Sequence, residues 1–167
     1  MNVIRKMAVA LVVFSATCSA KLSAQEFVNF QSTETGICVT VPSDMNLVKH
    51  DETILHLQSD LVSLSIHPML TEGLTAEAMT EGMKKTAAAA GFDLGKMTAD
   101  QFDHKTLEMV IYSGKNEDGV VFGVGVIQPK ENDKVAFLMT LTYADGAGDI
   151  AAGTIINSLE FNPDVIE

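Results

Sequence analysis

The residues whose types and spacing could support chemistry are His50, Glu52, His56 and His67. Imidazole and carboxylate groups are the ligands of many zinc sites. If residues 53–68 form a β-hairpin, His67 falls opposite Glu52 and shares a face with His56, while His50 lies two residues further along. The four residues then define a metal site or a small active site. The simpler interpretation is that these histidines lie on a solvated sheet face.

Cys38 is the second candidate for chemistry, and we expect it to be structural. The residues around it, Gly36–Pro42, alternate with a period of two, which predicts a half-buried strand ending at the proline. A catalytic thiol needs a base and a group that orients the base, and no residue close in sequence supplies them. Unpaired cysteines are among the most buried residues in proteins. Because Cys38 lies opposite the face of Ile37, Val39 and Val41, a helix has to cover it.

Motifs of catalytic strength are missing from the sequence. It contains no nucleophile elbow, no phosphate-binding loop, no His-Glu-x-x-His pattern and no paired-cysteine metal spacing. Methionine is abundant, but it recurs at the spacings of a hydrophobic core and does not indicate a copper site. We therefore assign no catalytic, cofactor-binding or metal-binding residues, and we expect a protein that is not an enzyme and needs no cofactor.

Residues 1–24 have the three-part layout of a secretory signal peptide. Two basic residues form the start, an apolar run follows over Met7–Ala16, and small residues precede the cleavage site. The apolar run is about half as long as the roughly 20 residues that a membrane-spanning helix needs. We therefore expect that the protein is not an integral membrane protein. Cleavage after Ala20 and after Ala24 both fit, and we favour the second because Lys21 would directly follow the first.

Cys18 allows a competing interpretation, in which the leader belongs to a lipoprotein and this cysteine is lipidated. The residues before it, Ser15-Ala16-Thr17, lack the leucine three places earlier and the Gly or Ala directly before the cysteine that this pattern usually has. We therefore expect a soluble exported protein, periplasmic or secreted, with residues 25–167 forming one domain.

The mature chain is strongly acidic. Three of the 11 basic residues and none of the 22 acidic residues lie in the leader, which leaves 8 Lys, no Arg, no Trp and a formal charge of −14. Proteins that bind nucleic acids neutralise phosphates with Lys and Arg, so we expect no nucleic-acid binding. An anionic membrane surface repels such a chain as well. If the acidity serves binding rather than solubility, the partner is a basic protein.

The segment 53–68 predicts a hairpin with Ser59 and Asp60 as its two loop residues. In this register the apolar residues of both strands lie on one face, with Leu57 opposite Val62. The apolar face of the hairpin therefore belongs to the core.

The chain then changes to a helical period over 75–90, with Thr75 as the N-cap. Gly91 is expected to end this helix by taking the left-handed conformation. Three alternating runs follow, separated by short polar connectors typical of hairpins, over 104–114, 119–129 and 134–144. Gly123 and Gly125 share one face of the middle strand, which leaves room above its backbone. A closely packed helix is the expected occupant, and a ligand groove is the alternative.

The C-terminal segment predicts a short helix over about 147–158 and a brief last strand. Its inward residues are expected to be Ile150, Leu159 and either Thr154 or Ile155. The order of elements predicts an α+β fold in which an antiparallel sheet, made of the hairpin and the three-stranded meander, packs in layers with two helices.

These elements resemble the PsbP/DcrB-like α/β sandwich over most of residues 34–162. The stretch "GICVTVPSDM" is similar to the strand running into a proline with which family members often begin. The stretch "LTYADGAGDIAAGTIINSLEF" is similar to their closing strand and helix, with Leu159 where an aromatic residue often follows the Asn-Ser pair. The resemblance implies a non-catalytic binding scaffold, since the family includes exported lipoproteins, photosystem subunits, adaptors and effector chaperones. It implies no site residues.

The function that the sequence favours is an exported, non-enzymatic module that binds another protein, as an adaptor, an accessory subunit or an inhibitor-like immunity protein. The partner surface is expected on the acidic strand face, on the face of Gly123 and Gly125, or at a sheet edge. The alternative is a metal-binding protein or small enzyme that uses the histidine cluster.

We predict that the mature protein begins at Lys21 or Gln25, because the leader is a cleaved signal peptide. Mass spectrometry of the protein purified from the envelope fraction gives the N-terminal residue directly. An intact Met1, or a lipid on Cys18, would show that this interpretation is wrong.

Overall fold

The computed structural model describes residues 25–166, so the leader with its two cleavage sites and Cys18 lies outside the described residues. Two α-helices are formed, α1 (Ala76–Ala89) and α2 (Asp149–Ser158). The strands in chain order are β1 (Phe27–Gln31), β2 (Ile37–Pro42), β3 (Asn46–Asp51), β4 (Ile54–Gln58), β5 (Val62–Leu70), β6 (Thr98–Asp103), β7 (Leu107–Lys115), β8 (Val120–Pro129), β9 (Val135–Ala144) and β10 (Glu160–Phe161). Short 3-10 turns occupy Leu94–Lys96 and Pro163–Val165.

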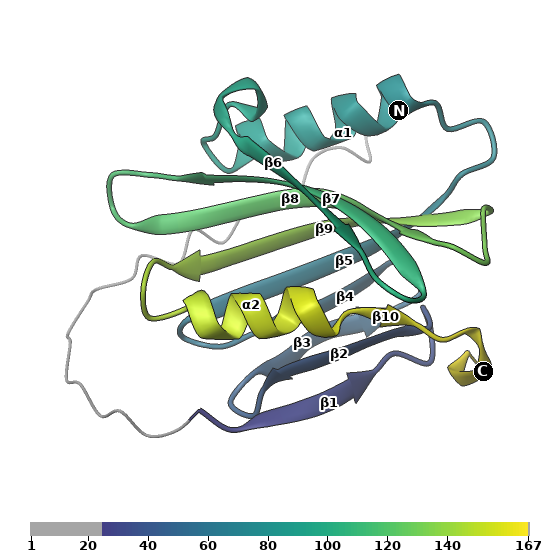
Figure 1. The fold of residues 1–167 in the computed structure, drawn as a ribbon, viewed down its shortest axis with the longest axis horizontal. Coiled ribbons are helices and arrows are strands. Elements are labelled where there is room, and N and C mark those ends of the chain that lie inside the picture. The colour runs from purple at the N-terminus through teal and green to yellow at the C-terminus, as the bar shows by residue number, and fades with distance from the viewer. Residues whose placement is uncertain (1–24, 167) are drawn as a thin grey trace.

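The strands form two antiparallel sheets, as Figure 1 shows. The large sheet has the order β3-β4-β5-β9-β8-β7-β6, and the small sheet has the order β1-β2-β10. The predicted hairpin and meander belong to one sheet, because β5 pairs with β9 along its whole length, from Val62 opposite Tyr143 to Leu70 opposite Val135. The predicted α+β class is confirmed, with the small sheet as an additional layer.

One face of the large sheet packs against the small sheet and α2, and the main core lies between them. Small-sheet residues Ile37, Val39 and Val41 are buried there, as their alternation predicts. The other face packs against α1 around β8, where Phe122 and Val124 contact Met83 and form a smaller cluster. The sandwich thus has one fully covered sheet face and one face that is covered only at one end.

The predicted hairpin is present, but its register is wrong by two residues. Leu57 lies opposite Leu64, and the two loop residues are Asp60 and Leu61. The reason is Ser59, whose hydroxyl oxygen accepts hydrogen bonds from the backbone N–H groups of Leu61 and Val62 and stabilises the turn in this register. A shift of two residues keeps each side chain on its face, so the expected core residues are still buried.

The space above Gly123 and Gly125 is filled by neither a helix nor a ligand groove, contrary to both expectations. The side chain of Ile111 on β7 lies over the two glycines. A Cβ atom built on Gly125 would clash with the carbonyl oxygen of Val110 and lie 3.0 Å from Cα of Ile111. The glycines therefore allow β7 to lie close against β8, where it crosses the sheet in Figure 1.

Both predicted helices are present. The Thr75 hydroxyl caps α1 by accepting a hydrogen bond from the N–H of Ala78, and Gly91 takes the left-handed conformation after the helix. On α2, Ile155 and Leu159 are buried as expected, but Ile150 is 69% exposed. Ile150 points outward because the alanines at 151 and 152 turn their small side chains to the core and let the helix approach the sheets.

We predict that Gly125→Ala lowers the free energy of unfolding by about 1–3 kcal/mol, because its methyl group has to displace the β7 backbone. Gly82→Ala in α1 is the matched control: its Cβ meets no atom within 4 Å, so it should leave stability unchanged or raise it by about 0.5–1 kcal/mol. Urea unfolding of both variants measures the difference. Equal stability of the two variants would contradict the packing described for β7.

Candidate functional site

The structure separates the histidines that the sequence grouped. His50 pairs with Leu55 and so lies on the core-facing side of the sheet, where its Nε2 is 2.8 Å from the hydroxyl of Ser32. His56 is the next residue on β4 after Leu55 and therefore lies on the opposite face. Glu52 lies in the turn between β3 and β4 and does not pair with His67.

His56 and His67 remain on one face, over β4 and β5. Because the hairpin register differs by two residues, His67 comes level with Ile54, next to the pair of Leu55 and Ile66, and not with Glu52. On its other side His67 pairs with Leu138 of β9. Within residues 25–166, no group of three or more His, Cys, Asp and Glu side chains is placed to hold a metal ion. The predicted four-residue cluster is therefore not formed.

The face that carries these two histidines is polar beyond the end covered by α1. Cross-strand rows of half-buried hydroxyl, amide and imidazole side chains run across it, namely Gln58–Ser63–Thr142 and His56–Ser65–Thr140. The His56 Nε2 is 3.2 Å from the hydroxyl of Ser63. Burial lowers the pKa of His56, and burial, followed by the nearby charges of His56 and Lys49, lowers the pKa of His67.

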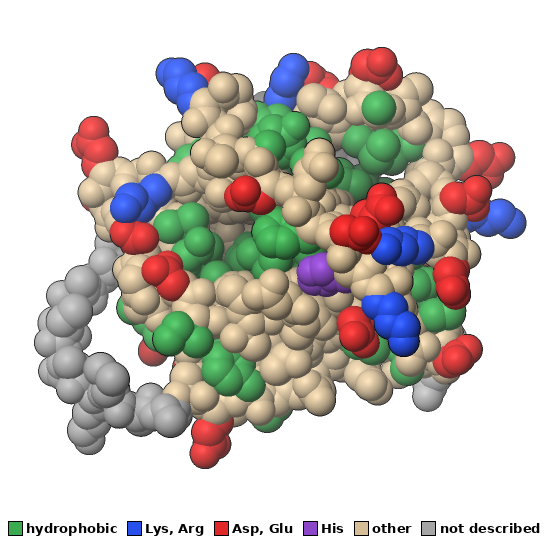
Figure 2. Space-filling view, in the orientation of Figure 1, with side chains coloured by type: hydrophobic (Ala, Val, Ile, Leu, Met, Phe, Trp, Pro, Cys, Tyr) green, Lys and Arg blue, Asp and Glu red, His purple; other side chains and the backbone are tan. Residues whose placement is uncertain are grey.

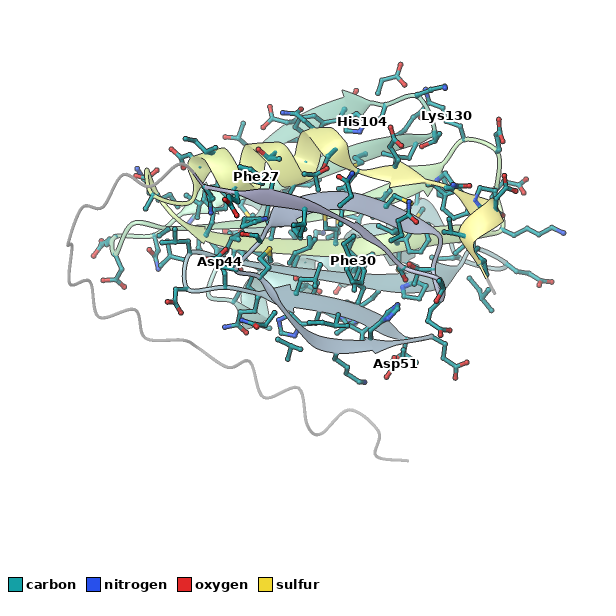
Figure 3. The ribbon with its side chains drawn as sticks, turned by 90° about the horizontal axis from the view of Figure 1, so that it is seen from below. Phe27, Phe30, Asp44, Asp51, His104 and Lys130 are labelled. Atoms are coloured by element: carbon teal, nitrogen blue, oxygen red, sulfur yellow. The ribbon has the colours of Figure 1, made fainter. Side chains whose placement is uncertain are left out.

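His104 has a structural role. Its Nδ1 donates a hydrogen bond of 3.0 Å to the carbonyl oxygen of Leu159, and its ring packs edge-on against Phe102. The contact ties the turn between β6 and β7 to the end of α2 (Figure 3).

Cys38 is half-buried, which is less than we expected, and no cysteine pairs with it among the described residues. It lies on the outer face of the small sheet, between Gln31 of β1 and Glu160 of β10. Burial, and then the charge of Glu160, raises the pKa of the thiol. A raised pKa leaves less thiolate at neutral pH, so the surroundings of Cys38 do not favour a nucleophile.

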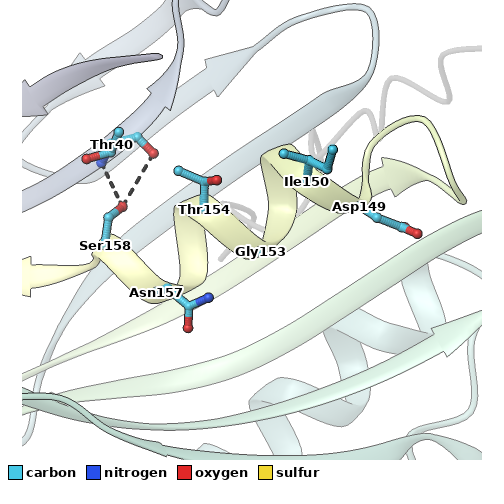
Figure 4. A pocket seen from close by; sticks show the side chains of 7 residues that line it. All are labelled: Thr40, Asp149, Ile150, Gly153, Thr154, Asn157 and Ser158. Carbon is cyan, nitrogen blue, oxygen red and sulfur yellow. Dashed lines mark hydrogen bonds between the residues drawn. The ribbon is translucent and has the colours of Figure 1, made fainter. Parts of the chain in front are cut away.

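A shallow hollow lies along the outer face of α2, and its serine, Ser158, is used within the fold. Figure 4 shows its lining, in which the hydroxyl of Ser158 accepts a 2.8 Å hydrogen bond from the backbone N–H of Thr40. This bond takes the place of a strand neighbour just before β10 begins, so Ser158, the serine of the Asn-Ser pair that carried the family resemblance, connects the end of α2 to β2. The hollow brings no catalytic groups together.

An apolar edge is the surface feature that the fold leaves unexplained. Among residues 25–166, six large apolar side chains are exposed, and three of them lie on the adjacent edge strands β1 and β3: Val28 at 49%, Leu47 at 50% and Val48 at 55%. Phe30 and Met45 are half-buried and connect these exposed residues to the main core, against which they pack. We call these five residues the edge patch.

The edge patch is continuous because β1 and β3 run side by side. The ring of His50 on β3 packs edge-on against Phe30 of β1, with ring centroids 5.8 Å apart, and bonds to Ser32 just beyond β1. Figure 3 shows that the two strands point in the same direction, since the chain runs from left to right both from Phe27 to Phe30 and from Asp44 to Asp51. They belong to different sheets and do not pair with each other, so both edges are open.

Acidic residues surround the edge patch. Glu26 and Asp44 are exposed at one end, and Asp51 closes the other end. A hydrogen bond from the Thr53 hydroxyl, followed by the 3.0 Å ion pair with Lys49, lowers the pKa of Asp51 strongly, so this carboxylate stays charged. Acidic side chains are also spread over the front face of the molecule in Figure 2. An apolar strip with acidic ends can bind a segment that is apolar in the middle and basic at its ends.

Comparisons with known proteins identify the fold. No protein-family model and no curated protein matches the sequence. Solved structures that match include cyanobacterial PsbP (CyanoP) from Synechocystis sp. PCC 6803, with a TM-score of 0.56, 12% identity and coverage of 89% of this chain and 99% of that chain. Another is the Ran-binding protein Mog1p of Saccharomyces cerevisiae, with a TM-score of 0.55, 10% identity and coverage of 86% and 100%. The expected resemblance to PsbP is confirmed for the fold. No helix of residues 25–166 is long and apolar enough to cross a bilayer.

The half-buried His67 generates a prediction about acid stability. Because burial lowers the pKa of His67 in the folded chain below its usual range, the unfolded chain binds more protons, and the free energy of unfolding falls as the pH drops from neutral into the acid range. We expect His67→Gln to lose less stability between pH 8 and pH 5 than the wild type, as measured by denaturant titrations at each pH. Ser65→Ala, on the same face, is the control and should keep the wild-type slope. A slope unchanged by His67→Gln would contradict the burial described for His67.

Proposed function

We propose that this protein is an exported, non-enzymatic module that binds another protein through the edge patch. The observation that carries the proposal is the gathering of Val28, Leu47 and Val48 on two adjacent open strands of a chain that is otherwise strongly acidic. Apolar side chains that gather in one place on a soluble domain mark interaction sites, and open strand edges offer unpaired backbone groups to a partner.

The charge of the chain supports a basic partner. The mature chain carries a formal charge of −14 and 8 lysines. The ion pairs of residues 25–166 use four of these lysines: Lys49–Asp51, Lys96–Asp93, Lys115–Asp145 and Lys130–Asp103. Uncompensated carboxylates near the patch attract a basic surface and speed its approach, while the apolar strip supplies the contact that excludes water. Association should then slow at high salt.

The fold comparison supports a role in protein binding. The solved neighbour Mog1p is described as a Ran-binding protein, so this sandwich serves as a protein-binding scaffold in at least that case. Export rests on the leader in the sequence. The alternative function, a metal site or active site at the histidines, has no support from the geometry, because His50 lies on the opposite face of the sheet from His56 and His67, and among residues 25–166 no group of three or more His, Cys, Asp and Glu side chains is placed to hold a metal ion.

We predict that Leu47→Asp abolishes capture of the envelope partner, because it places a charge in the centre of the apolar strip. The measurement is cross-linking in the envelope followed by affinity purification and mass spectrometry. Leu70→Asp is the matched control: Leu70 is 80% exposed at the end of β5, two strands away from β3, and its replacement should leave capture unchanged.

Equal recovery of the partner with Leu47→Asp and with the wild type would exclude the edge patch as the docking surface. Loss of the partner with both aspartate variants would indicate a general effect of added charge and would also contradict the proposal.

A further inference from the structure

The backbone of β1 presents a regular set of unpaired groups. At its two ends the N–H of Ser43 donates to the carbonyl of Glu26, and the N–H of Ser32 donates to the carbonyl of Ile37, both at 2.9 Å. Bonded residues alternate along an antiparallel strand, so the even-numbered residues from 26 to 32 turn their N–H and C=O groups toward β2. Phe27, Asn29 and Gln31 therefore turn theirs outward, and no second strand of the described residues pairs with them.

The other edge strands are protected against pairing with another chain. The edge of β3 is interrupted by a bulge between Leu47 and Lys49, and it carries the charges of Lys49 and Asp51. The β6 edge carries Asp100 and Asp103, and β10 is only two residues long. Charges, bulges and short length are the usual protections of an open strand. The five residues of β1, Phe-Val-Asn-Phe-Gln, contain no charge and no proline, and β1 pairs with β2 without a bulge.

The sequence of β1 allows two copies of this strand to pair antiparallel about a two-fold axis that passes between their Asn29 residues. Antiparallel pairing of two copies through the outward groups places Val28 opposite Phe30 of the second copy, an apolar pair on the inner face. It places Glu26 opposite Ser32 of the second copy, so no two carboxylates oppose each other along the strand. Two chains that each carry a charge of −14 can meet only where charge is sparse, and β1 is such a place.

The same axis brings the exposed residues of β3 together. His50 contacts Phe30 and Ser32, so residues of β3 lie level with β1 residues that are 18 to 20 positions earlier in the chain. Asn29 is therefore level with Leu47 and Val48. An axis that passes between the two copies of Asn29, perpendicular to the sheets, places Leu47 and Val48 of one copy beside those of the other. All three exposed residues of the edge patch then lie close to the axis.

We propose that the occupant of this edge is a second copy of the chain, bound by antiparallel pairing of β1 with β1 into a two-fold dimer with a continuous six-stranded outer sheet. This inference goes beyond the proposed function: it takes the same edge patch as the docking surface but places a second copy of the chain there, so self-association and binding of a basic partner exclude each other at this edge. Closed two-fold dimers are the commonest assemblies of identical chains. The dimer is weak at low salt, because the two acidic chains repel each other, and it strengthens as salt screens this repulsion.

The test is the mass of the mature protein by sedimentation at about 0.5 mM protein, where a dimer with a micromolar Kd, as expected of a small interface, is populated. We expect the mass to double, with a larger dimer fraction at high salt. Asn29→Pro removes one outward N–H but none of the hydrogen bonds to β2, and proline is tolerated at such an edge position. It should give a monomer, whereas Asn29→Ala, which loses the same side-chain bond to Thr40, should stay dimeric.

Val28→Asp is a second variant that keeps the test valid if Asn29→Pro fails to fold. It adds one charge per chain near the axis, at a residue that is already 49% exposed, and it should also be monomeric. A monomeric wild type at every salt concentration, or an Asn29→Pro dimer as strong as the wild type, would overturn the proposed dimer. A monomer whose capture of an envelope partner still depends on Leu47 would overturn the dimer and leave the proposed function standing. If the dimer forms but Leu47→Asp captures the envelope partner as well as the wild type does, the proposed function is rejected.

Discussion

The pairing of β5 with β9 is the constraint on which the rest of the structure depends. It joins two segments that lie more than 60 residues apart in the chain and turns a hairpin and a meander into one seven-stranded sheet. Its register aligns Leu64 with Leu141 and Ile66 with Met139, so both halves turn apolar residues to the same side. Only this combined face is wide enough for the small sheet and α2 to cover together. With no disulfide among the described residues, the buried interface between these layers stabilises the fold.

Regular alternation made the central strands predictable, and its absence hid the edge strands. The runs that became β7, β8 and β9 alternate over nine or ten residues and end at turn residues, so their existence follows from sequence alone. The edge strands β1, β3 and β6 pair on one side only, and their side chains are mostly exposed or half-buried, so no periodic pattern marks them. The hairpin register depended on one hydroxyl, that of Ser59, which a pattern of apolar residues does not report.

The candidate site could not be predicted from the sequence for a related reason. Exposure of Val28 and Leu47 depends on which strands end the two sheets, and that order is a property of the whole fold. The histidine cluster failed for the opposite reason, because it was derived from a local register. The only local sign of the edge patch is that Phe27, Val28 and Phe30, and likewise Leu47 and Val48, are apolar residues in polar surroundings.

The acidity of the chain and its apolar edge work together. A fold shared with proteins of 10 to 12% identity shows that many sequences can bury this core, so what distinguishes one member from another lies on its surface. On this surface, carboxylates repel other acidic chains almost everywhere and suppress indiscriminate contacts. The uncharged β1 strand and the exposed Leu47 and Val48 are the exception, and charge at both ends restricts which strand can approach them. Specificity at this edge therefore comes from repulsion around it as much as from attraction within it.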